Sequence, residues 1–245
     1  MTLNSVGRLY GVGVGPGDPE LMTLKAQRII ASSDVIAYFA ARARRGNSYD
    51  VIESLLTEHH EVIRFTYPVT TEAVAHADYE AMIASFYDEC AATLAGHLTA
   101  GVDVAVICEG DPFFYGSYMY IHQRLATRFA TEVVPGVTSF SAAAAAAGCP
   151  LVALNETLSV ISGVLGPDEL RHALAGADAA VIMKVGRNLA AVRDAVQDSG
   201  RANGAFYVER ASHASERIIP LLETNDVDAP YFSLVLVPGI QVATR

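Results

Sequence analysis

A short apolar segment between two glycines limits the folds that this chain of 245 residues can adopt. Residues 103–108 form an almost continuous apolar run that lies between Gly101 and Gly110. Such runs are typical of parallel strands that are buried on both faces. Over the first half of the chain, similar runs alternate with stretches of helical periodicity. This alternation predicts an α/β fold with a parallel sheet.

The expected strands of the first half lie at residues 8–14, 35–39, 61–65, 103–108 and 132–134. The expected helices lie at 21–31, 49–56, 73–99, 114–129 and 138–147, and Asp18 is expected to cap the first of them with Pro19 following. In the second half, strands are expected near 158–162, 179–184, 205–209 and 232–237, with helices near 168–175 and 189–198. Shorter connections there predict a mixed α/β domain with antiparallel pairs. We therefore expect an N-terminal domain at 1–115, a connecting helix at 116–130 and a C-terminal domain at 131–245.

The composition disfavours several classes of protein. Apolar residues make up 51% of the chain and charged residues 18%, which allows a sizeable core. The formal net charge of −10 disfavours a nucleic-acid partner. No apolar stretch has the roughly 18 residues of a membrane-spanning helix, and no secretory leader is recognisable, so we expect a cytoplasmic protein with no membrane partner. Three cysteines without C-x-x-C spacing and seven histidines without a ligand motif predict no metal site.

Four glycines, at positions 11, 13, 15 and 17, end the first expected strand and begin the loop after it. Their density before a helix predicts a tight turn that lets a ligand approach the backbone. The spacing fits neither the dinucleotide fingerprint G-x-G-x-x-G nor a phosphate loop with G-K-[ST]. Pro16 removes an amide donor and Asp18 would repel a phosphate, so the loop suits a neutral or cationic ligand. A tight turn without a ligand is the alternative.

An acidic loop, Glu109-Gly110-Asp111-Pro112, comes directly after the buried strand 103–108. The carboxyl ends of parallel strands meet at one edge of a sheet, and ligands bind at that edge. The two carboxylates could therefore hold a cationic ligand or serve as a base. Solvated carboxylates in a D-P turn are the alternative.

Two other segments could bind a flat ligand with acidic groups. Arg42, Arg44 and Arg45 follow the second expected strand, where they could grip carboxylates or simply form an exposed loop. A dense aromatic segment follows the acidic loop and could form core as well as an apolar wall. Its members are Phe113, Phe114, Tyr115, Tyr118 and Tyr120.

Six segments, in this order, resemble the tetrapyrrole (corrin/porphyrin) methyltransferases, which use S-adenosyl-L-methionine. They read G-V-G-V-G-P-G-D-P-E-L-M-T-L-K-A at 11–26, E-G-D-P-F-F-Y-G-S at 109–117, V-V-P-G-V-T-S-F-S-A at 133–142, V-I-M-K-V at 181–185, Y-V-E-R-A-S at 207–212 and P-Y-F-S-L-V-L-V at 230–237. The resemblance spans essentially the whole chain. Within the family, the aromatic run and the final P-Y-F-S are most similar to the branch that methylates C20 of the macrocycle. One departure is Glu109, where many relatives have Gly or Ser.

The resemblance implies two α/β domains with a cleft between them, a homodimer, and S-adenosyl-L-methionine as cofactor. The implied cofactor-binding residues are Pro16, Gly110, Asp111, Phe114, Tyr115, Thr138, Ser139, Met183, Ala211, Tyr231 and Phe232, of which the last four would surround the adenosine. The expected substrate-binding residues are Gly15, Pro16, Arg42, Arg44, Arg45, Tyr118 and Lys184.

The implied reaction is methyl transfer to C20 of precorrin-2, which gives precorrin-3A in cobalamin biosynthesis. A cobalt-containing form of the same macrocycle and uroporphyrinogen III are alternative substrates. The electron-rich macrocycle is the nucleophile, so the protein has to orient it, exclude water and remove the C20 proton. We expect Asp111 to take that proton, with Glu109 as the second candidate. The glycine spacing disfavours a nicotinamide-dependent reductase, whereas a non-catalytic carrier stays open.

Overall fold

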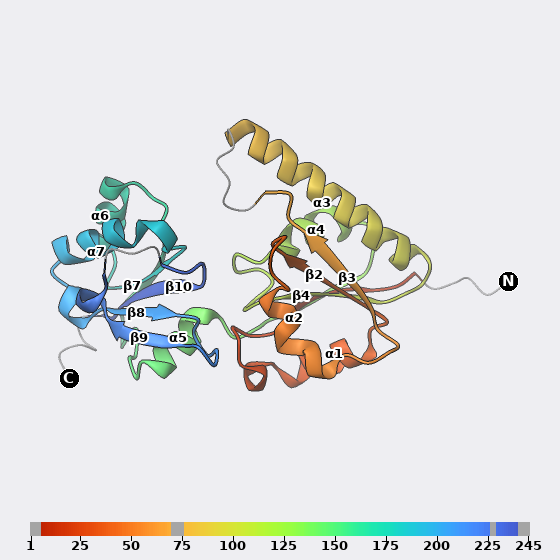
Figure 1. Ribbon diagram of the computed structural model, residues 1–245, viewed down its shortest axis with the longest axis horizontal. Coiled ribbons are helices and arrows are strands. Elements are labelled where there is room, and N and C mark those ends of the chain that lie inside the picture. Colours follow the sequence, from red (N-terminus) through yellow and green to blue (C-terminus); the bar gives the residue numbers. More distant parts are fainter. Residues whose placement is uncertain (1–5, 70–75, 226–228, 240–245) are drawn as a thin grey trace. The chain divides into compact units, whose positions relative to one another are not determined.

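The computed structural model describes residues 6–69, 76–225 and 229–239, and it divides the chain into two compact units (Figure 1). Unit one comprises residues 1–138 and unit two residues 139–245. This division falls later than the expected boundary at 116–130. The reason is that the strand at residues 131–134 pairs with the first strand of the chain, which keeps it and the preceding helix in unit one.

Unit one contains a five-stranded parallel sheet in the order β3-β2-β4-β1-β5. Its strands are β1 (Leu9–Gly13), β2 (Val35–Ala40), β3 (Glu61–Thr66), β4 (Val104–Cys108) and β5 (Thr131–Val134). β4 lies in the centre between β2 and β1, and all five of its residues are buried. The prediction of a doubly covered parallel strand at this place is confirmed.

Helices cover both faces of this sheet (Figure 1). The helices are α1 (Leu24–Ser32), α2 (Asn47–Ile52), α3 (His76–Thr99) and α4 (Tyr118–Leu125). Side chains of α1 and α2 pack on Ala105 and Ile107 of β4, whereas α3 and α4 pack on Val104, Val106 and Cys108. Alternate residues of β4 therefore pack into two separate hydrophobic cores, one on each face of the sheet.

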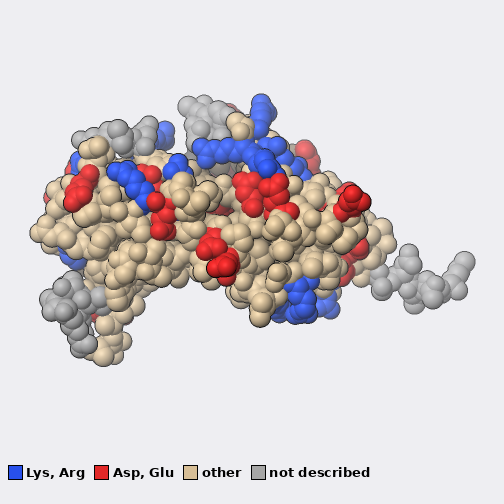
Figure 2. Space-filling model, turned by 60° about the horizontal axis from the view of Figure 1, so that its bottom comes forward, with Lys and Arg blue, Asp and Glu red and all other residues tan. Residues whose placement is uncertain are grey.

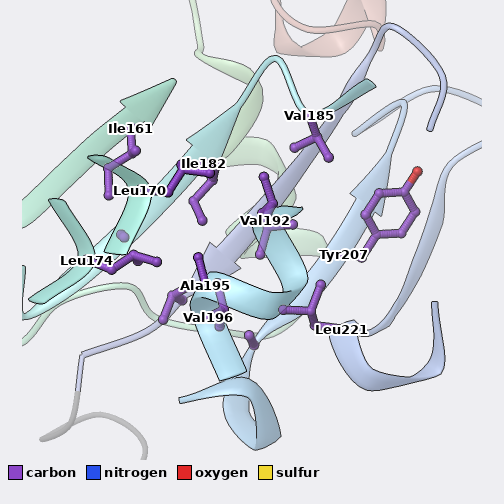
Figure 3. Close-up of a cluster of buried hydrophobic side chains, with 14 of the residues drawn as sticks. Ile161, Leu170, Leu174, Ile182, Val185, Val192, Ala195, Val196, Tyr207 and Leu221 are labelled. Atoms are coloured by element: carbon purple, nitrogen blue, oxygen red, sulfur yellow. The ribbon is translucent and has the colours of Figure 1, made fainter. Parts of the chain in front are cut away.

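Unit two contains a mixed sheet in the order β6-β7-β10-β8-β9. Its strands are β6 (Leu158–Ser162), β7 (Ala179–Met183), β8 (Phe206–Glu209), β9 (Arg217–Pro220) and β10 (Ser233–Val237), and its helices are α5 (Ser139–Ala146), α6 (Pro167–Ala175) and α7 (Leu189–Asp198). Only β6 and β7 are parallel; the other pairs are antiparallel, as the shorter connections predict. Leu170 and Leu174 of α6 and Val192 and Val196 of α7 pack on the sheet around Ile182 (Figure 3).

The structure corrects four details of the expected elements. α1 begins at Leu24, because Thr23 accepts the N–H of Ala26, and Asp18 caps a separate 3-10 turn, Pro19–Leu21. α4 is shorter than expected, because the chain turns at Tyr115, whose φ is +56°. The edge strand β9 was not expected. The predicted helix start at residues 73–75 lies outside the described residues.

Within the described residues, no helix is long and apolar enough to cross a membrane. On the face drawn in Figure 2, basic and acidic side chains lie together in small groups, with broad uncharged areas between the groups.

Candidate active site

Three loops of unit one meet at the carboxyl edge of its sheet. They follow β4, β1 and β5, which are neighbours in the sheet and run in the same direction. The Gly110 N–H donates to the Gly15 carbonyl at 2.8 Å, and the Val14 N–H donates to the Cys108 carbonyl at 3.0 Å. The expectation that the glycine loop and the acidic loop lie together is therefore confirmed.

Glycines allow the three loops to approach backbone to backbone. A Cβ on Gly13 would lie 2.6 Å from both the Gly110 oxygen and the Gly136 nitrogen, and a Cβ on Gly136 would lie 1.9 Å from the Gly110 oxygen. Neither position has room for a side chain. Gly110 itself has a φ of +66°, and a Cβ built on it would meet only the Val137 oxygen, at 3.9 Å. A side chain at position 110 would therefore have room for its Cβ, in contrast to positions 13 and 136.

Asp111 joins two of the loops through its carboxylate. Oδ1 accepts the N–H of Phe113 at 2.8 Å, and Oδ2 accepts the N–H of Gly136 at 3.0 Å. Both oxygens of the Asp111 side chain thus accept hydrogen bonds from backbone N–H groups. Asp111 therefore holds the loop after β4 against the loop after β5. Its expected role as the base stays a prediction.

Replacing Asp111 with Ala is expected to separate these two loops. Hydrogen bonds to a charged group contribute about 1.5–3 kcal/mol each, so we expect an unfolding free energy lower by roughly 2 kcal/mol and an affinity for the methyl donor lower by about tenfold. Asp178→Ala is the matched control. Asp178 directly precedes β7 in unit two and likewise accepts two hydrogen bonds, both from Thr157. Chemical denaturation and calorimetric titration check both variants. If both weaken donor binding equally, Asp111 has no specific role.

Glu109 lies at the end of β4 and is mostly buried. Burial raises the pKa of its carboxyl to about 8, and a hydrogen bond with Asn47, at the start of α2, lowers it in part. No backbone N–H among the described residues donates to this carboxyl group. Near neutral pH, Glu109 is therefore a carboxyl group whose proton can move, which is the property required of a general acid or base.

The raised pKa makes the stability depend on pH. In the unfolded chain the carboxyl ionises near its ordinary pKa of 4.5, whereas in the folded chain it keeps its proton up to about 8. The stabilising contribution is therefore complete below pH 4.5 and is lost between these two values, by about 1.4 kcal/mol per pH unit. We expect Glu109→Gln to match the wild type near pH 4 and to exceed it by up to about 5 kcal/mol near pH 9. Denaturant titrations across this range check the difference, and a difference that does not vary with pH would contradict the assignment.

The three arginines of the loop after β2 are not equivalent. The guanidinium of Arg45 pairs with Glu53, lies 3.6 Å from the Asp50 carboxylate and stacks on the Tyr49 ring at 4.8 Å. Arg45 is therefore paired with acidic residues of the helical segment that follows it, and its expected role toward a ligand stays a prediction. The side chains of Arg42 and Arg44 are exposed.

The aromatic segment divides between core and surface. Tyr118 is fully buried, and its ring occupies the space that a Cβ on Gly11 would need. The expectation that Tyr118 contacts a substrate is corrected for this reason. Phe113, Tyr115 and Tyr120 are each 41–49% exposed. These three aromatic side chains are open to a ligand, and Phe114 is half-buried.

The other expected residues of unit one lie close to the three loops. Gly15 and Pro16 are buried, and Gly15 has a φ of +81°. Phe114 donates its N–H to the Asp111 carbonyl at 3.3 Å. Thr138 ends the unit, and Ser139 begins α5.

In unit two, the strand directions bring four expected residues to one edge of the sheet. β10 is antiparallel to β7 and β8, so its start lies beside their ends. Met183 pairs with Leu234, and the Arg210 N–H donates to the Phe232 carbonyl at 2.7 Å, next to Ala211. Tyr231 is 73% exposed and its ring packs edge-on against Phe232. Lys184 follows Met183 with a φ of +57° and is exposed.

Sequence reasoning missed Asn47 and the closeness of Gly13 to Gly136. The close approach of Gly13 and Gly136 was foreseeable only in part, from the P-G pair at 135–136. Asn47 gives no signal in the sequence, because it reaches Glu109 across neighbouring strands. Among the described residues, no group of three or more metal-ligating side chains lies together.

Comparison with known proteins defines the class. Residues 8–224 match the model of the Tetrapyrrole (Corrin/Porphyrin) Methylases. A precorrin-2 C(20)-methyltransferase of Sinorhizobium sp is 51% identical over 235 residues, 96% of each chain. A cobalt-precorrin-2 C(20)-methyltransferase of Salmonella typhimurium is 32% identical over 94% of this chain and 96% of that protein. The structure of a uroporphyrin-III C-methyl transferase of Thermus thermophilus with S-adenosylhomocysteine has a TM-score of 0.68 and 26% identity, over 98% of this chain and 100% of that one.

The chain therefore belongs to the tetrapyrrole (corrin/porphyrin) methylases. It is a methyltransferase, and S-adenosyl-L-methionine is its methyl donor. The described residues fit this cofactor. The Gly110 backbone has room beside it, and the preceding residue, Glu109, has a carboxyl group that can balance a cationic sulfonium when it is ionised.

Proposed function

We propose that this chain transfers a methyl group to C20 of precorrin-2, giving precorrin-3A in cobalamin biosynthesis. The observation that carries the proposal is 51% identity, over 96% of each chain, with a protein of that name. The site of unit one supports it, because three backbone-packed loops adjoin a carboxyl group with a raised pKa. The cobalt-containing macrocycle is the second candidate substrate, because a relative named for it is 32% identical.

The residues of unit one divide the work of the reaction. S-adenosyl-L-methionine supplies the methyl group as an electrophilic carbon on a cationic sulfur. The backbone of Gly15, Gly110 and Gly136 shapes the space beside it, and Asp111 holds two of the loops in place. Catalysis requires the reacting carbon to lie about 3–3.5 Å from the methyl group, so rigid loops contribute by orientation.

Glu109 is the residue that we assign to the C20 proton. As C20 gains the methyl carbon, its C–H bond breaks and the proton passes to the Glu109 carboxylate. The group must be ionised to accept it, so the rate should rise with pH up to about 8 in the absence of other charges. A cationic sulfur nearby favours the ionised form of Glu109, so the pH at which the rate stops rising moves to a lower value.

Other parts of the proposal rest on the family resemblance. We propose that Met183, Ala211, Tyr231 and Phe232 contact the adenosine, that Phe114, Tyr115, Thr138 and Ser139 lie near the rest of the cofactor, and that Pro16 and Lys184 lie toward the substrate. We also propose that the protein acts as a homodimer in the cytoplasm. Three free, buried cysteines are compatible with a reducing compartment.

Product mapping tests the proposed reaction. The protein is incubated with a ¹³C-methyl donor and either precorrin-2, its cobalt form or uroporphyrinogen III, and NMR locates the label. We expect the label on C20 of the metal-free macrocycle. Label on C20 of the cobalt form alone would make the cobalt-containing macrocycle the substrate. Label at another carbon would assign the chain to another branch of the family, and binding without any methylated product would indicate a carrier.

A further inference from the structure

Arg64 of β3 grips the turn that carries the exposed arginines. β3 lies beside β2, with Arg64 opposite Tyr38, so its side chain starts close to the end of β2. Its Nη2 donates to the carbonyls of Ala41, Arg42 and Arg44 at 2.9, 3.3 and 2.6 Å. One guanidinium nitrogen thus donates to three carbonyl oxygens of one turn. Within this turn, the Arg44 N–H also donates to the Ala41 carbonyl at 3.1 Å.

This arrangement leaves a set of positive charges without acidic partners. Within the described part of the chain, no carboxylate pairs with Arg42, Arg44 or Arg64, whereas Arg45 is neutralised by Glu53 and Asp50. The chain as a whole has a net charge of −10, so an uncompensated basic turn is unusual in it. Because the backbone oxygens of the turn are held by Arg64, the turn is preorganised before any ligand arrives.

The basic turn leads directly into the site of unit one. Gly46, with a φ of +102°, ends the turn, and Asn47 begins α2 and forms a hydrogen bond with Glu109. An anionic group at Arg42 or Arg44 would therefore be held close to the carboxyl that we assign to proton removal. Paired guanidinium groups suit carboxylates, because each can form two parallel hydrogen bonds.

We propose that Arg64 is a positioning residue, which fixes the turn so that Arg42 and Arg44 bind carboxylates at the rim of the macrocycle. The proposal rests on the proposed function, and it separates these two arginines from Arg45. Arg64 acts through the backbone of the turn rather than by touching the substrate. Its effect should therefore depend on the presence of Arg42 and Arg44.

The test compares steady-state kinetics of single and combined variants. Arg42→Gln/Arg44→Gln should raise the KM for the tetrapyrrole about 10- to 100-fold, and Arg64→Gln about 5- to 20-fold, with kcat and the KM for the methyl donor within about twofold. Adding Arg64→Gln to the double variant should change KM by less than about twofold. Arg64→Lys should recover part of the loss, and the control Arg45→Gln should behave as the wild type. The KM of the double variant should also depend less on salt.

Several results would overturn the proposal. The first is an unchanged KM for the tetrapyrrole in Arg64→Gln. The second is a KM in the triple variant that equals the product of the separate effects of Arg64→Gln and the double variant, and the third is a rise in KM in Arg45→Gln as large as that in Arg64→Gln. Thermal unfolding of each variant separates these outcomes from a loss of fold. If the wild type methylates no tetrapyrrole, the proposed function fails, and absorbance titration of the wild type and the same variants with uroporphyrin, a polycarboxylate macrocycle, still decides the role of Arg64.

Discussion

Replacing Glu109 with Gln is expected to slow methyl transfer to the tetrapyrrole by about 10²–10⁴-fold, the usual contribution of a general base. The side chain is mostly buried at the end of β4, and its carboxyl has a pKa raised to about 8 by that burial. Gln keeps the shape and the hydrogen bond with Asn47 but cannot accept a proton. Single-turnover rates with saturating methyl donor measure the effect.

Two further measurements separate the base from a simple counter-charge. If Glu109 removes the proton, donor affinity in Glu109→Gln should stay within about threefold, and the pH dependence of the wild-type rate should flatten in the variant. If Glu109 only balances the sulfonium, affinity for the donor falls and the rate at saturation is kept. Glu132→Gln is the control, since Glu132 pairs with Lys25 at 2.6 Å and Arg8 at 3.3 Å near the opposite edge of the sheet. An unchanged rate in Glu109→Gln would remove Glu109 from the mechanism.

Replacing Gly136 with Ala is expected to force apart the loops after β4 and β5. The new Cβ would lie 1.9 Å from the Gly110 oxygen and 3.0 Å from the Gly13 Cα, both backbone atoms that cannot rotate away. We expect the unfolding free energy to fall by about 1–3 kcal/mol, as in other overpacked sites, and the donor affinity to fall by at least about tenfold. Denaturant titration and calorimetric binding measure the two effects.

Gly96→Ala provides the matched control for this change. Gly96 lies within α3, and a Cβ there would meet no atom within 4 Å. Ala should therefore stabilise the helix by about 0.5–1 kcal/mol and leave donor binding unchanged. Equal donor affinities for the wild type and Gly136→Ala would show that the close approach of the loops does not shape the cofactor site.

The sequence was sufficient to predict an element of the fold where a single physical factor decides its structure. The apolar run 103–108 became the central strand β4 because only a strand covered on both faces is apolar at every position. β9 was missed because a short edge strand that ends in Pro220 has little apolar signal. The division after Thr138 was missed because the pairing of β5 with β1 joins residues more than a hundred positions apart, which no local pattern reports.

The candidate site shows the same limit. The acidic loop and the glycine loop were located correctly, since parallel strands bring their carboxyl ends to one edge. The sequence alone could not rank Asp111 and Glu109, because the ranking that we propose depends on which carboxylate meets backbone N–H groups and which is left in a buried place. The burial of Tyr118 on Gly11 was equally invisible, because helical spacing alone does not say which aromatic ring turns toward the sheet.

A crystal structure of the protein with S-adenosylhomocysteine tests the central claim most directly. The claim is that the loops after β1, β4 and β5 bind the reacting end of the methyl donor. We expect the sulfur beside the Gly110 backbone and within about 6 Å of the Glu109 carboxyl, the range over which opposite charges affect each other strongly. A cofactor whose sulfur lies away from these three loops would contradict the claim.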